Sequence, residues 1–196
     1  MQRAIHNCAC IAPLPAANYY GTFVLNTTCM IAFQQADVKF LLRNTIAHRK
    51  FITAQVAKHL NKTRKTNGRF KLSLSFVFCS DEYLLSINRQ FLNHDYYTDI
   101  ITFPLENNEQ GIESEIYISI DRVLDNSKKY VKLAGNKPKE EISIKSEAFI
   151  NELDRVIFHG VLHLLGYKDK TSTQKAEMRR MEDLWLRAFK RFLAAQ

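Results

Sequence analysis

Apolar and polar residues alternate strictly along two stretches of the chain, which is typical of a strand with one buried face. The alternation is clearest over residues 70–78, and it recurs over residues 116–120. A third strand is expected over residues 99–103, where Pro104 would end it. The acidic, polar and glycine-containing residues 106–114 are expected to form a loop.

Elsewhere apolar residues recur at three- and four-residue spacing, which predicts helices with one buried face. These helices are expected over residues 37–62, 81–91 and 140–165, followed by a last helix capped by Thr171 or Thr173. The last helix has an apolar stripe of Met178, Met181, Trp185, Ala188 and Phe192. Because strands and helices are interspersed without a regular βαβ rhythm, the expected fold class is α+β, a small mixed β-sheet packed with helices.

The N-terminal residues differ in composition from the rest of the chain. Residues 1–29 hold a single charged residue, and Pro13 and Pro15 interrupt their apolar stretch, which disfavours a signal peptide. We therefore expect residues 1–29 to be an extension outside the domain, with the true translation start at Met30. Residues 30–196 are then expected to form a single domain, a length that can bury a substantial core.

Net charge and cysteine content indicate which binding partners and which cellular compartment to expect. The formal charge of +8 favours polyanions such as RNA, although many basic proteins bind nothing acidic. No apolar run approaches the roughly 20 residues that span a bilayer, so no membrane partner is expected. Among the residues expected to fold, Cys79 is the one cysteine, which provides no disulfide framework and indicates a reducing, cytoplasmic location.

Two histidines and an aspartate form a pattern that is typical of a metal-binding site. His159 and His163 are four residues apart on the third expected helix, so both side chains project from one face. Gly166 is placed to end this helix, and Asp169 follows where a third ligand could return to the same ion. Two histidines and a carboxylate form a known catalytic zinc site with an open position for water. The alternative is one core and one surface histidine, which the apolar surroundings and the following turn disfavour.

The residue after the first histidine argues against a peptidase. Zinc proteases carry a glutamate there as the general base, whereas this chain has Gly160. A glycine inside a helix costs about 1 kcal/mol relative to alanine, so a close approach by a substrate or a neighbouring strand is expected.

Two stretches of the chain resemble two motifs of the YbeY family of endoribonucleases, and they occur in the family's order. Residues 159–167 match His-Gly-x-Leu-His-Leu-x-Gly-Tyr at every defined position, and the family's third histidine falls on Asp169. Residues 88–103 match a second motif at Asn88, Asp95, Thr98, Asp99 and Phe103. One departure is Leu92, which stands where the family has a basic residue.

The resemblance implies a zincin-like fold in which a central helix carries the ligands of one zinc ion. It also implies a metal-dependent, single-strand-specific endoribonuclease that acts in small-subunit ribosomal RNA 3′ maturation and ribosome quality control. The implied partners are precursor ribosomal RNA and the small ribosomal subunit. An alternative is a ribosome-associated RNA-binding factor with a structural metal, which the departure at Leu92 leaves open. A third is a hydrolase of peptides, which Gly160 disfavours.

Two further groups of residues are candidates for catalysis and RNA binding. His94 and Asp99 are candidates for proton transfer or for orienting the histidines, with a solvated loop residue and a strand-end cap as the respective alternatives. The basic face of the last helix, which includes Arg179, Arg180 and Arg187, is a candidate for holding phosphates, as is the basic loop over residues 62–69.

Overall fold

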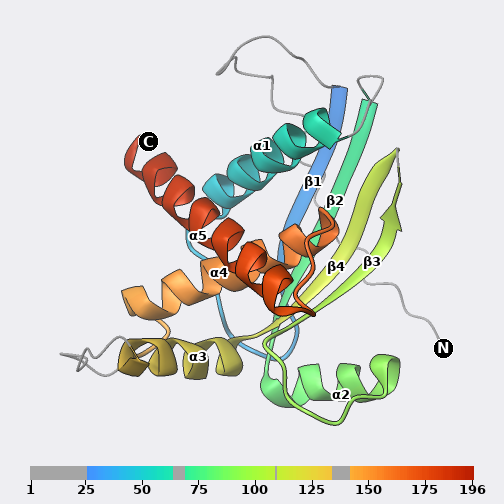
Figure 1. Ribbon diagram of the computed structural model, residues 1–196. Helices are drawn as coiled ribbons and strands as arrows, with labels where there is room; N and C mark the ends of the chain where they lie inside the picture. Colours follow the sequence, from blue (N-terminus) through green and yellow to red (C-terminus); the bar gives the residue numbers. More distant parts are fainter. Residues whose placement is uncertain (1–25, 64–68, 109, 134–141) are drawn as a thin grey trace.

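The computed structural model describes residues 26–63, 69–108, 110–133 and 142–196, which form a mixed sheet and the helices around it (Figure 1). The strands are β1 (Asn26–Gln35), β2 (Arg69–Cys79), β3 (Ile100–Asn107) and β4 (Gly111–Ser119). The helices are α1 (Thr45–Thr63), α2 (Asp81–Leu92), α3 (Ile120–Leu133), α4 (Glu147–Leu164) and α5 (Ser172–Ala194). The expected fold class, a small mixed sheet packed with helices, is confirmed.

The sheet has the strand order β1-β2-β4-β3. β2 pairs in parallel with both β1 and β4, whereas β3 is an edge strand antiparallel to β4. Alternate β2 side chains such as Leu74 and Phe76 enter the main core with α1, α4 and α5. On the opposite face, α2 packs near the end of the sheet and forms a smaller cluster through Leu84 and Ile87.

Three expected elements differ from those in the structure. The first helix begins at Thr45 rather than at residue 37. Residues 37–44 lie outside it because Phe40 packs into the core against Phe78. β3 runs through Pro104, because an edge strand tolerates a residue without an N–H, and its register with β4 shifts there. Much of the expected loop at 106–114 is strand on either side of a tight turn.

The third expected helix is α4, which begins at Glu147 rather than at residue 140 because Ser146 caps it by accepting a hydrogen bond from Phe149 N. Thr171, one of the two expected caps, starts α5 through a reciprocal pair of hydrogen bonds with Gln174.

Some sequence-based expectations lie outside the described residues. Residues 64–68 of the expected basic loop are among these, as are most of residues 1–29. β1 begins at Asn26, and its register with β2 pairs residues 26–29 with residues 69–72. The intact mass of the natural protein would test the translation start that was expected at Met30. Among the described residues, no helix is both long enough and apolar enough to cross a membrane.

Candidate metal centre

The candidate site is built at the C-terminal end of α4 and in the turn that follows. One face of α4 is buried against the sheet. Gly166 follows the end of the helix with a φ of 94°, a backbone conformation that residues with a side chain rarely adopt. The Tyr167 N–H then donates to the Leu162 carbonyl, which turns the chain back over the end of the helix. This turn brings Asp169 toward the two histidines.

Gly160 places α4 directly against the sheet. A Cβ added at this position would lie 2.8 Å from Cδ1 of Ile100 and 3.2 Å from Cγ2 of Ile116. A side chain at this position would therefore require Ile100 and Ile116 to shift. This contact is the close approach by a neighbouring strand that was one of the two reasons expected for a glycine inside the helix.

The structure brings all three expected ligands together. The Nε2 atoms of His159 and His163 are 2.9 Å apart, and Oδ2 of Asp169 lies 3.9 and 3.8 Å from them. Ligand atoms around a tetrahedral zinc ion, with bonds of about 2.0–2.1 Å, are separated by about 3.3 Å. The observed distances bracket that value, so the three side chains fit one small divalent cation.

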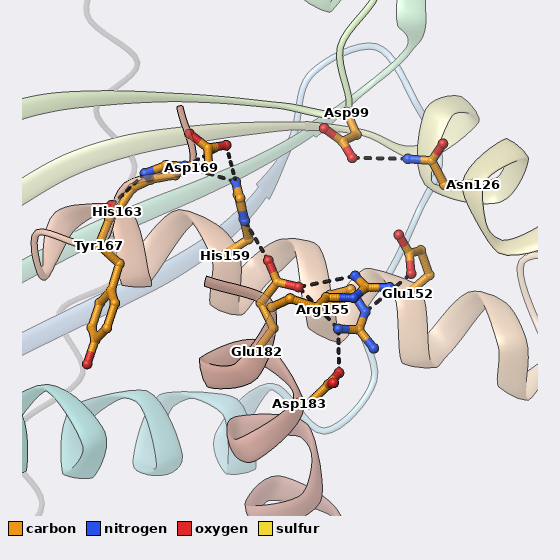
Figure 2. A network of polar contacts seen from close by, with 11 residues as sticks. Asp99, Asn126, Glu152, Arg155, His159, His163, Tyr167, Asp169, Glu182 and Asp183 are labelled. Carbon is orange, nitrogen blue, oxygen red and sulfur yellow. Dashed lines mark hydrogen bonds and ion pairs between the residues drawn. The ribbon is translucent and has the colours of Figure 1, made fainter. Parts of the chain in front are cut away.

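Both histidines present the same nitrogen to this position. Nδ1 of His159 lies 2.7 Å from Oε1 of Glu182, and Nδ1 of His163 lies 3.0 Å from the Tyr167 carbonyl (Figure 2). A carbonyl and a carboxylate can only accept, so each Nδ1 carries a hydrogen and donates it. The Nε2 lone pairs of two neutral rings then face each other, an arrangement that a cation between them stabilises.

The pKa values of the two histidines shift in opposite directions. Burial would lower the pKa of His159, but the hydrogen bond and charge of Glu182, with smaller contributions from Asp99 and Asp169, raise it. Burial and, second, the neighbouring His159 lower the pKa of His163. One ring therefore keeps a lone pair free at neutral pH.

Glu182 belongs to a network of charged residues beneath His159 (Figure 2). Its second oxygen, Oε2, lies 3.1 Å from Nη1 of Arg155 and 3.2 Å from Nη1 of Arg179. Arg155 also contacts Asp183 at 2.8 Å and Glu152 at 3.6 Å. Burial would raise the pKa of Glu182, but the hydrogen bonds and charges of His159 and Arg155 outweigh it and lower that pKa.

Two more carboxyl groups lie near the network. Asp99 accepts a hydrogen bond from Asn126 at 3.0 Å, and its negative charge contributes to the pKa shifts of both His159 and Glu152. Burial raises the pKa of Glu152 to about 7, while the positive charge of Arg155 opposes that increase. Asp99 therefore lies close enough to influence the site electrostatically without being one of the three converging ligands.

The other expected site residues take different positions. His94 is exposed on the loop after α2, and its ring stacks with Tyr96 at a centroid distance of 5.1 Å. None of the contacts that the structure gives His94 reaches the three ligands. On α5, Arg179 faces the network through Glu182, Arg180 pairs with Glu177, and Arg187 is exposed.

Sequence reasoning missed the role of Glu182 and of Arg155. A signal for Glu182 was present, because it lies four residues after Met178 and three before Trp185, on the apolar stripe of α5. An acid on a buried stripe indicates a partner inside the fold. Arg155 offered a similar signal, since it lies one turn before His159 on the same face of α4.

Fold and site together define a class, an α+β protein whose central helix presents two histidines and a nearby carboxylate as a candidate metal-binding group. The model of the family described as endoribonuclease YbeY matches residues 31–190. The chain belongs to this family. The resemblance seen in the sequence is thereby confirmed, together with the class of enzyme that it implied.

Two relatives of known family agree with this assignment. The endoribonuclease YbeY of Cytophaga hutchinsonii is 42% identical over 81% of this chain and 96% of its own length. That of Amoebophilus asiaticus is 43% identical over 78% of this chain and 88% of its own length. A solution structure from Thermotoga maritima aligns at 22% identity and a TM-score of 0.44, covering 82% of this chain and 89% of that one.

Proposed function

We propose that this protein is a metal-dependent endoribonuclease that cleaves single-stranded RNA, with precursor ribosomal RNA of the small subunit as its substrate. The observation that carries the proposal is the convergence of the His159 and His163 Nε2 atoms with the Asp169 carboxylate. Family membership supports the reaction. The imidazole ligands favour zinc as the ion.

The three ligands leave part of the coordination sphere of a tetrahedral ion for water or substrate. His159, His163 and Asp169 would hold a divalent cation, whose positive charge would stabilise charge developing on a phosphoryl oxygen and would make a nearby water more acidic. The side chain of Asp169 is about half exposed, so the site is accessible to a polymer such as RNA.

Asp99 and His94 are the proposed catalytic residues outside the ligand set. Asp99 has the stronger support, because its carboxylate influences the pKa of His159 and is held by Asn126. We propose that Asp99 accepts or orients a proton near the cleavage site. His94 lies five residues earlier, on the exposed loop that leads to Asp99, where it is available to contact the RNA chain.

We propose that the basic face of α5 holds the phosphates of the RNA. Arg180 and Arg187 are exposed on this helix, which begins only three residues after Asp169. Arginine side chains bind phosphate oxygens through charge-assisted hydrogen bonds. A helix that starts beside the metal ligands can therefore guide the backbone of a single strand toward them.

We further propose that the protein acts in the cytoplasm, in ribosome maturation and quality control. The two described cysteines, Cys29 and Cys79, are both free thiols, as expected in a reducing compartment.

Cleavage of an end-labelled single-stranded RNA tests the function directly. Wild-type protein, purified without a histidine tag, is expected to cut the RNA with added zinc and to lose the activity with a chelator. His163→Ala is expected to be inactive, while Lys71→Gln, which changes an exposed residue of β2 that pairs with Glu113 away from the site, serves as the control. If the protein bound RNA and zinc without cutting, the enzyme proposal would be wrong and an RNA-binding factor with a structural metal would replace it.

A further inference from the structure

We propose that Glu182 is a positioning residue that selects the metal-binding tautomer of His159, and so sets the affinity of the site for its ion. The inference rests on the proposed metal site and deepens it. It concerns a residue on α5, a different helix from the one that carries the two histidines.

The first step is the geometry of the contact. Oε1 of Glu182 lies 2.7 Å from Nδ1 of His159, and the Glu182 residue is only 5% exposed. A carboxylate offers acceptors only, so the hydrogen must be on Nδ1, which leaves the Nε2 lone pair for the metal. Water has little access to compete for this bond.

The second step is that Glu182 is itself held in place. Its other oxygen accepts hydrogen bonds from Arg155 and Arg179, and Arg155 is anchored in turn by Asp183. The backbone on either side is fixed by the buried side chains of Met178 and Trp185. Both oxygens of the carboxylate are therefore engaged, and Oε1 is the one that faces His159.

The third step is the need for such a residue in this site. The other anchored histidine, His163, donates to a backbone carbonyl, which carries no net charge. Asp169 is partly exposed and lies almost 4 Å from both rings, so water competes for its carboxylate. A full negative charge behind His159 raises the basicity of that ligand, and partners of this kind typically change metal affinity by about 10–100-fold.

Two substitutions of similar size separate positioning from packing. Glu182→Met removes the acceptor but keeps apolar bulk on a stripe that already carries methionine, whereas Glu182→Gln keeps an acceptor oxygen without the charge. Zinc affinity, measured by competition with a chromophoric chelator, is expected to fall about 10–100-fold in Glu182→Met. Glu182→Gln should lie between Glu182→Met and the wild type. Glu177→Met, an exposed acid on the same helix that pairs with Arg180, is the matched control.

A second measurement reports the tautomer without any metal. In nitrogen-15 NMR of the metal-free wild type, the His159 ring should carry its hydrogen on Nδ1, and Glu182→Met should shift it toward Nε2. A wild-type affinity in Glu182→Met would overturn the proposal, and so would an Nε2-protonated His159 in the wild type. Neither readout involves RNA, so a failure of the nuclease proposal is recognised separately by the cleavage assay.

Discussion

Asp169 differs chemically from the histidines that it joins, because its carboxylate adds a negative charge to the site. It reaches the histidines by way of the turn at Gly166, whose positive φ reverses the chain. The sequence made the position of this candidate ligand predictable, since a glycine and an acid follow the histidine pair at short spacing. The position of Glu182 depends on how α5 packs on α4, which no local spacing reveals.

Replacement of Asp169 tests whether it is the third ligand. Asp169→Ala leaves two ligands and is expected to lower zinc affinity at least tenfold, while Asp169→His restores a neutral third ligand and recovers binding. Competition with a chelator measures both, and Glu177→Ala, which removes an exposed acid of α5 that pairs with Arg180, is the control. Equal zinc affinity in Asp169→Ala and wild type would exclude Asp169 as a ligand.

Glu152 makes stability depend on pH in a definite direction. Its pKa is raised from 4.5 to about 7, so the folded protein holds this proton more tightly than the unfolded chain. The contribution of this proton to the free energy of unfolding is therefore complete below about pH 4.5 and is lost as pH rises toward 7. The loss amounts to up to about 3 kcal/mol, at about 1.4 kcal/mol per pKa unit.

Glu152→Gln removes that titration while keeping the size of the side chain. We expect the variant to be more stable than wild type at pH 8 by about 1–3 kcal/mol, with a much smaller gain at pH 5. Urea unfolding of the metal-free protein at both pH values measures the difference. A gain that is the same at both pH values would mean that Glu152 does not titrate in this range.

Hydrophobic periodicity predicted the elements whose burial follows a simple pattern. β2, α2 and the second half of α4 agree with the expected strand and helices, because one face of each packs on the core. The start of α1 and the β3–β4 hairpin were missed for a different reason. Their ends depend on contacts distant in sequence, such as Phe40 on Phe78 and the pairing of an edge strand that contains proline.

The packing of α4 on the sheet gives a prediction for Gly160. Gly160→Ala should gain about 1 kcal/mol in helix propensity but introduce a methyl group 2.8 Å from Cδ1 of Ile100, for a net loss of about 1–2 kcal/mol. Because Ile100→Val deletes that atom, the alanine should cost less in the double variant than in the single one. A thermal-unfolding cycle of the four proteins checks this. Simple additivity would show that the contact is not the cause.

At the scale of the whole molecule, the exposed basic side chains can be compared between the two sides of the sheet. The exposed Arg180 and Arg187 of α5 lie on the helical side of the sheet, where Arg180 pairs with Glu177. Lys71 belongs to the other set of alternating β2 side chains and pairs with Glu113. Single-stranded RNA should therefore meet the α4–α5 side, where the candidate ligands are.

Salt dependence measures how many phosphates that side holds. Each phosphate contact that is lost should reduce the slope of log affinity against log salt by about 0.7. Arg180→Gln and Arg187→Gln are each expected to weaken RNA binding and flatten this slope, whereas Lys71→Gln should leave it unchanged. Fluorescence anisotropy with a labelled RNA, using catalytically inactive His163→Ala protein, gives the values. An unchanged slope in both arginine variants would remove α5 from the binding surface.

All three candidate ligands come from residues 159–169, after the last strand of the sheet in the chain. During synthesis the four strands can therefore emerge and pair before any ligand leaves the ribosome. Glu182 follows still later, on α5. A growing chain that has not yet reached residue 159 therefore lacks every candidate ligand, so the metal site can form only after α4 and the turn that follows it have been synthesised.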